Sequence, residues 1–511
     1  MLPRPSPEVP PCQQPRFVVP SVRGFDPDAI QPMEAAARAA LNPTATGVPR
    51  DQFAVRGGLT FPGVNGEPEG LYHTPKDNIM PRVGFAYELD DNTVLSGGYG
   101  MFYGFLGQRR GDVITSGFSA TTSLVPSLDN GLTFIETLSN PFQEGIVEPV
   151  GAALGAQTFL GQSITFFDSS PLSPRYQRWQ VGVQRGIGKN WVAEANYVGN
   201  YGSRLQTSRN LNATPLEYLS TSPVRDQSTI NFLSAQVPNP FFGLMPSTAG
   251  AAFRGANIAR ERLLRPYPQF DAVNTTTNEG YSWYHSGRVG IKRRFSSGYM
   301  IAANYTYSRY TQATEFLNAA DPEPTEVISD QDSPHRLSVS GIWELPFGQG
   351  RRFGGSTHPV LSKIISGWQV SGIYAYQTGV PLGFGNLLFT GNLDDIALSS
   401  GDRTVERWFN VDAGFNKVSA QQLGSNVRTF PLRLSSVRSD PVNNVDLSLI
   451  KNTRIVNDAM LQLRFEALNA LNHPLFPNPS TDPLAVSFGS IIASTQLNYS
   501  RRVQLMAKFL F

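Results

Sequence analysis

The C-terminal residues RRVQLMAKFLF (501–511) show the pattern that decides the fold. Apolar and polar side chains alternate there with a period of two, and side chains in a β-strand point alternately to opposite faces of a sheet. The segment is therefore predicted to be a strand with one apolar face and one mostly polar face. The residues on the predicted apolar face are Val503, Leu505, Ala507, Phe509 and Phe511.

The same alternation recurs upstream, clearest at 298–310, 335–348, 367–379 and 460–471. These segments run to about 10–12 residues, longer than the 5–6 usual in globular sheets and close to the 9–11 of a tilted membrane strand. A further strand is expected at 52–61 (QFAVRGGLTF). The pattern therefore predicts an all-β protein.

The connections between these strands alternate between short and long. Tight turns rich in Gly, Asn, Asp and Ser join neighbouring strands, as hairpins require. Long polar connections follow them at 104–174, 200–282, 310–333, 378–441 and 472–498, and the exception is the long stretch 348–365 on the short side. Outer-membrane barrels have short turns at one end and long loops at the other. We therefore expect a partial antiparallel transmembrane β-barrel of about 12–16 strands with long extracellular loops.

Composition excludes several other classes. Of the 511 residues only 16% are charged, against about a quarter in ordinary soluble domains, and the net charge of +2 predicts no nucleic-acid partner. No run reaches the roughly 18–20 apolar residues of a membrane helix, and Cys12 is the single cysteine. We expect residues 1–51 to form a proline-rich, irregular segment with a short helix near 33–41, and residues 52–511 to form the barrel.

Aromatic residues cluster near the predicted strand ends. Amphipathic rings favour the membrane–water interface, so they predict an aromatic girdle; cross-strand packing is the alternative explanation. The girdle candidates are Tyr99, Tyr103, Tyr305, Tyr307, Trp343, Trp368, Tyr374 and Tyr376.

No catalytic or cofactor-binding motif is present, so the sequence predicts neither an enzyme nor a cofactor. The five histidines are scattered singly. One loop is acidic, and oxygen ligands suit calcium, but the spacing fits no calcium-binding loop and favours a solvated acidic loop instead. These weak metal candidates are Asp321, Glu323, Glu326, Asp330 and Asp332.

The chain resembles the C-terminal part of the Oar-like TonB-dependent receptors of acidobacteria. The resemblance lies in PRVGFAYELDDNTVLSGGYGMFY (81–103) and in the segments 173–205, 333–353, 365–382 and 464–480. It implies a location in the outer membrane of a Gram-negative bacterium, with the lipid bilayer as a partner. The terminal Phe511 and the alternating residues before it are similar to the signal read by the barrel-assembly machinery.

Full-length members of that family look like a signal peptide, a carboxypeptidase-regulatory-like domain, a plug and a barrel of about 22 strands. Neither a signal peptide nor a plug is recognisable in this sequence, so the expected product is a truncated fragment. An energy-coupling inner-membrane complex is expected as a partner only of a longer product. The implied function is passive or energy-coupled uptake of a large nutrient, an oligosaccharide or a chelate. The alternatives are an outer-surface structural or adhesion protein and, least favoured, a soluble secreted β enzyme.

Overall fold

The computed structural model describes residues 21–105, 113–115, 117–124, 126–143, 145–348, 351–354, 358–456, 459–492 and 496–511. Cys12 and the first twenty residues of the predicted irregular segment lie outside these ranges.

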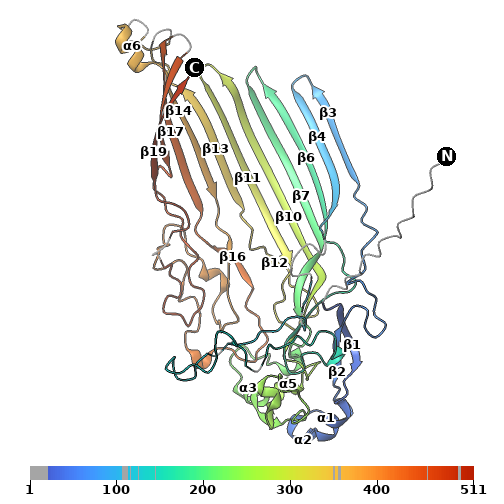
Figure 1. Cartoon of the computed structure of the whole chain (residues 1–511). Coiled ribbons are helices and arrows are strands. Elements are labelled where there is room, and N and C mark those ends of the chain that lie inside the picture. The colour runs from blue at the N-terminus through green and yellow to red at the C-terminus, as the bar shows by residue number, and fades with distance from the viewer. Residues whose placement is uncertain are drawn as a thin grey trace, which may run out of the picture.

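A single thirteen-stranded sheet dominates the described part of the chain (Figure 1). Each strand of its main path pairs antiparallel with the strand that precedes it along that path, which confirms the predicted all-β, antiparallel fold. Two short strands, β5 (Ile164–Phe167) and β12 (Val327–Ile328), pair with β10 and β11 off the main path. The strands of the path are β3 (Arg82–Asp90), β4 (Thr93–Tyr103), β6 (Arg175–Ile187), β7 (Trp191–Asn210), β10 (Val273–Ser296), β11 (Tyr299–Ala313), β13 (His335–Glu344), β14 (Trp368–Gln377), β17 (Val442–Val456), β18 (Ala459–Leu468) and β19 (Arg502–Leu510).

Short and long connections lie at opposite ends of the sheet, as predicted. Figure 1 shows the tight turns at the top and the long connections at the bottom, and we call these the turn end and the loop end. The turn between β10 and β11 is set by Ser297 (φ 53°) and Gly298 (φ 84°). Two successive residues with positive φ form the turn whose twist matches a two-stranded ribbon. The exceptional stretch 348–365 ends in a helix, α6 (Pro359–Ile365), at the turn end.

Two strands run further into the loop end than predicted. β7 has 20 residues and β10 has 24, so part of the expected loop 200–282 continues the ladder. The polar segment 273–280 supplies β-branched threonines there, and its pairing with β7 shifts register near Arg204 (φ 56°) and Gly280. In the stretch 200–282, a polar composition therefore did not distinguish a loop from a strand.

The expectation that 52–61 adds a strand to the large sheet is wrong. This stretch contains β2 (Arg56–Thr60), which pairs only with β1 (Gly24–Ile30) in a separate two-stranded sheet. The physical reason is burial, because Phe53 and Phe61 are each only 2% exposed and pack in a core at the loop end. The predicted helix near 33–41 is confirmed as α1 (Glu34–Ala40).

Several short elements of the loop end were not predicted. The remaining elements there are α2 (Pro43–Thr46), α3 (Gln227–Ser234), α4 (Ala251–Arg254), α5 (Arg260–Leu263), β8 (Gln236–Pro238), β9 (Asn257–Ala259), β15 (Pro381–Gly383), β16 (Arg433–Arg438) and the 3₁₀ turns Gly155–Gln157, Leu216–Tyr218, Leu393–Ile396 and Ser419–Gln421.

Two hydrophobic cores organise the long connections. The first loop core joins residues 22–61 to the β4–β6 and β7–β10 connections, with Phe241 and Phe270 almost fully buried in it. The second loop core joins the β14–β17 connection, including the fully buried Phe409, to Ile491 of the β18–β19 connection. The long connections are therefore folded bodies with cores of their own.

The large sheet has two distinct faces. Register pairing links residues across neighbouring strands, and one set of alternate positions is mostly apolar; we call this the apolar face, and its opposite the polar face. One row of the apolar face is Ile301, Gly341, Gly372, Leu447, Ala467 and Val503. One row of the polar face is Arg288, Thr306, Arg336 and Gln377.

The sheet is not closed within the described residues. Strands β3 and β19 form the two ends of the path, and neither has a partner on its outer side. Every residue of β3 is exposed, and side chains such as Val83 (71%) and Leu505 (79%) lack neighbours.

Candidate functional site

The predicted girdle residues all lie on the apolar face. Tyr305 and Tyr307 are alternate residues of β11, and their neighbours on β13 are Leu337 and His335. The same two-residue alternation places Tyr99 and Tyr103 of β4, Trp343 of β13, and Trp368, Tyr374 and Tyr376 of β14 on that face. Trp343 and Trp368 lie near the turn end, and the other six lie nearer the loop end.

A second aromatic group on the apolar face was missed by the sequence reasoning. The ring of Trp283 lies 4.2 Å from that of Tyr201 and 6.4 Å from that of Trp179, measured between centroids. Beside them the Tyr197 hydroxyl lies 2.8 Å from Nδ1 of His285, and an equivalent pair joins Tyr305 to His335 at 2.7 Å. The signal that could have found these residues is the alternation of side chains, which continues past the predicted strand end at 198 to Tyr201.

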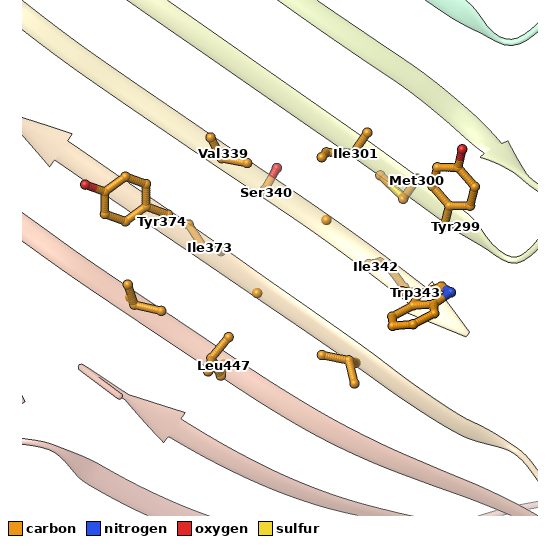
Figure 2. Close-up of a pocket in the computed structure, with 14 residues that line it drawn as sticks. Tyr299, Met300, Ile301, Val339, Ser340, Ile342, Trp343, Ile373, Tyr374 and Leu447 are labelled. Atoms are coloured by element: carbon orange, nitrogen blue, oxygen red, sulfur yellow. The ribbon is translucent and has the colours of Figure 1, made fainter. Parts of the chain in front are cut away.

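The apolar face contains a shallow depression between its two aromatic ends (Figure 2). Its volume is about 620 Å³, and its floor lies at Gly341 and Gly372, which are register partners on β13 and β14. Figure 2 shows Tyr299 and Trp343 together at one end and Tyr374 at the other. The lining is almost entirely aliphatic and aromatic, so the depression suits a hydrocarbon group.

The polar face carries charges that are paired with one another. Arg288 of β10 contacts Glu194 of β7 at 2.8 Å and donates to Asn304 of β11 at 2.7 Å. On β18, Arg464 pairs with Glu466 at 3.2 Å. Charge pairs across neighbouring strands stabilise one face of a sheet and keep that face hydrophilic. The arrangement suits a water-filled interior.

Of the five loop carboxylates considered as calcium ligands, Asp332, Glu326 and Asp321 have partners of their own. Asp332 is 1% exposed and pairs with Arg438 at 2.7 Å. Glu326 accepts a hydrogen bond from the Tyr281 hydroxyl at 2.9 Å, and Asp321 accepts one from the backbone N–H of Asn318. Among the described residues no group of three His, Cys, Asp or Glu side chains is placed to hold a metal ion.

Four of the five predicted assembly-signal residues lie on the edge strand β19, and Phe511 follows directly after it. Val503, Leu505, Ala507 and Phe509 line its apolar face, and Phe511 is fully exposed at the end of the chain. These side chains and the unpaired edge of β19 are accessible to another protein.

Two carboxylates at the rim of the first loop core have lowered pKa values. Burial raises the pKa of Glu261, but hydrogen bonds from Arg265 and Thr214, together with the charges of Arg265 and Arg262, outweigh it. Burial also raises the pKa of Asp271, and Arg262 outweighs it in the same way. Both groups therefore stabilise the folded loop end in their ionised form.

None of the helices in the described ranges has the length and apolarity that crossing a bilayer requires. Residues 20–504 match the family of outer membrane β-barrel domains. The chain belongs to this family. Its members are built from membrane-spanning β-strands, so the apolar face of the sheet is the lipid-facing face and the polar face lines the interior. Among curated proteins, no sequence matches the chain.

Several solved outer-membrane proteins are similar in structure at low sequence identity. The transporter YddB from Escherichia coli has a TM-score of 0.41 and 13% identity, over 84% of this chain and 41% of its own. The FrpB iron transporter from Neisseria meningitidis has a TM-score of 0.35 and 10% identity, over 83% and 38%. The siderophore receptor PiuA from Acinetobacter baumannii has a TM-score of 0.34 and 10% identity, over 83% and 35%. The chain thus spans less than half the length of these proteins.

Because the chain belongs to this family, the assignment of the lipid-facing and polar faces of β13 can be tested. Val339 lies on the lipid-facing face midway between the aromatic ends, and its neighbour Ser340 lies on the polar face. We expect Val339→Arg to destabilise the membrane-inserted protein by about 2–4 kcal/mol, the cost of an arginine at the bilayer midplane. Ser340→Arg is the matched control and should change stability little. Urea unfolding in lipid vesicles measures both, and equal losses would contradict the assignment of the faces.

The lowered pKa values predict an acid-sensitive loop end. The ordinary pKa values of Glu261 and Asp271 are 4.5 and 3.8, and folding lowers both. Their stabilising contribution is therefore complete above these values and is lost as the pH falls through the lower, folded-state values. We expect hydrogen exchange at 251–273 to accelerate below about pH 4.5 relative to the strands, and Glu261→Gln to weaken this pH dependence. The exposed Glu217→Gln serves as the control, and an unchanged profile in Glu261→Gln would count against the assignment.

Proposed function

We propose that this chain forms the C-terminal half of the channel of a TonB-dependent receptor of the Oar-like type, which takes up a large nutrient across the outer membrane. The observation that carries the proposal is a sheet with a lipid-facing face, a polar face that holds paired charges, and long connections that are folded at one end. Such a receptor binds and moves its cargo without changing it covalently. The resemblance of 81–103 and 464–480 to Oar-like receptors supports the subtype.

The open edges support a role as part of a larger barrel. A strand edge cannot remain unpaired in lipid, because lipid offers no hydrogen-bonding partner. β3 and β19 both run from the loop end to the turn end, since each begins after a long connection and the path alternates between them. An antiparallel closing segment must therefore contribute an odd number of strands, with its first and last strands both running toward the loop end. A receptor barrel of about 22 strands satisfies this condition.

A polar cavity at the loop end supports an oligosaccharide as the cargo. This cavity, of about 1000 Å³, lies among the loop-end extensions of β7 and β10 and the segment after β11. Its lining is rich in hydroxyl and amide groups, with Arg209 held between Glu279 at 3.2 Å and the ring of Phe316. Two carboxylates, Glu315 and Asp330, also line the cavity, and Glu315 is paired with Arg433. The hydroxyl and amide groups that make up most of the lining suit the hydroxyl groups of an oligosaccharide.

The remaining assignments depend on this proposal. The aromatic residues at the two ends of the apolar face act as the girdle: between Tyr299 and Tyr307 the strand advances about 26 Å, at about 3.3 Å per residue. The exposed edge strand β19 is the segment that the barrel-assembly machinery reads. Energy coupling requires a plug and a coupling segment in a longer product.

A structural or adhesive role on the outer surface is the second candidate. The observation that favours it is the extent of folded structure at the loop end, where two cores give the external part the character of a soluble domain. A surface protein needs no open interior, whereas a transporter does.

Occupation of the edges is tested by hydrogen exchange in native outer-membrane vesicles. If a closing segment is present, the backbone amides of β3 and β19 exchange as slowly as those of the central strands β10 and β11. Rapid exchange of both edges beside protected central strands would show that the sheet stays open, and it would overturn the proposed place of this chain in a barrel.

Transport is tested by solute flux. Liposomes that contain the assembled protein are expected to swell in an oligosaccharide solution, whereas protein-free liposomes and liposomes with protein added from outside serve as controls. Absence of flux from a barrel with protected edges would favour the structural role.

A further inference from the structure

A basic pocket lies at the loop-end border of the apolar face. It has a volume of about 520 Å³, where β11 leaves the region of the girdle, and β12, β13 and β16 complete its walls. The residues that carry the argument are Tyr307, Arg309, His335, Arg433, Arg438 and Asp332.

Strand register shows that this pocket opens toward lipid. Tyr307 and Arg309 are alternate residues of β11, so both have the parity of the lipid-facing face. Arg309 is the register partner of His285, and Tyr307 is the partner of His335. Arg309 therefore lies next to Tyr307 on the lipid-facing face, on its loop-end side. This is the level at which a membrane strand meets the lipid headgroups.

The arginines of the pocket are not fully neutralised. Arg438 is committed to structure, because its guanidinium donates to the carboxylate of Asp332 and to backbone carbonyls at both Asp332 and Gly379. Arg433 donates from Nη2 to Glu315, but its Nη1 is buried without a hydrogen-bond partner.

Arg309 carries a positive charge that no described residue neutralises. It is exposed, and it makes no hydrogen bond or ion pair to any described residue. Asp332 is the only carboxylate in the lining, and Arg438 already pairs with it. A net positive charge and unused guanidinium donors therefore remain in the pocket.

We propose that this pocket binds the phosphate of an outer-leaflet lipid headgroup. Guanidinium groups bind phosphate through paired, charge-assisted hydrogen bonds, and basic pockets at the membrane surface recognise anionic headgroups in this way. Arg309 supplies the donors, Arg433 and Arg438 form the basic wall behind it, and Tyr307 lines the site.

The neighbouring apolar surface favours a lipid over free phosphate as the source. The depression around Gly341 and Gly372 shares strands β11 and β13 with the basic pocket and lies further toward the turn end (Figure 2). Between Tyr307 and Ile301 the strand advances about 20 Å, which an acyl chain attached to the bound phosphate can follow. One molecule thus matches both the basic pocket and the apolar depression.

The test compares Arg309→Ala with Arg336→Ala. Arg336 is an exposed arginine next to His335, but it lies on the polar face. Its substitution therefore removes one positive charge near the loop end of β13 and leaves the pocket unchanged. Each protein is reconstituted in phosphatidylcholine vesicles with and without phosphatidic acid, and retained lipid is counted by native mass spectrometry. Arg309→Lys keeps the charge and should retain most of the binding.

We expect the unmodified protein and Arg336→Ala each to retain one molecule of phosphatidic acid. Arg309→Ala should bind phosphatidic acid about tenfold more weakly, which corresponds to the loss of about 1.4 kcal/mol of charge-assisted hydrogen bonding. Equal retention by Arg309→Ala and Arg336→Ala would overturn the proposal. Displacement of the lipid by an equal concentration of glycerol phosphate would also overturn it, because it would show a site for soluble phosphate. Heat-modified gel migration confirms that each variant is folded, and if Arg309→Ala is not, Arg309→Gln replaces it in the same comparison.

Discussion

The backbone ladder of the large sheet is the interaction on which the rest of the molecule depends. Lipid offers no donor or acceptor, so every amide and carbonyl of the spanning region must pair with a neighbouring strand. A slip of one residue would exchange the two faces. The register shifts in the described part of the sheet lie near the ends of strands. Examples are the shift at Ser296 in the β10–β11 hairpin and the shift at Gly280 in the loop-end extension. Between these ends the apolar and polar rows continue across the sheet.

The loop end follows the rules of a soluble domain. Residues far apart in the chain bury phenylalanines in common cores there, and Phe384, Phe409 and Phe415 stack within 5.5–6.1 Å of one another. One chain thus uses two ways of burying apolar surface. The strands turn it toward lipid, and the connections turn it toward one another. This division accounts for a charge content that is low for a soluble protein of this length.

The alternation of side chains was enough to predict the strands and their order, because a period of two is a local property. It misplaced 52–61, since β1 and β2 satisfy the same local pattern within a separate small sheet. The pairing of Asp332 with Arg438 lies beyond local reasoning, because 106 residues separate them. The aromatic group around Trp283 was missed because Tyr201 lies in a polar stretch that was predicted as a loop and instead continues β7.

The first loop core has a mechanical consequence for the mouth of the barrel. It joins residues 22–61 to the connections that follow β4 and β7, so segments from separate hairpins share one packed interior. A single connection cannot swing aside without exposing Phe241 or Phe270 to water. Any displacement on this side of the barrel therefore has to move these segments together, because their shared core couples them mechanically.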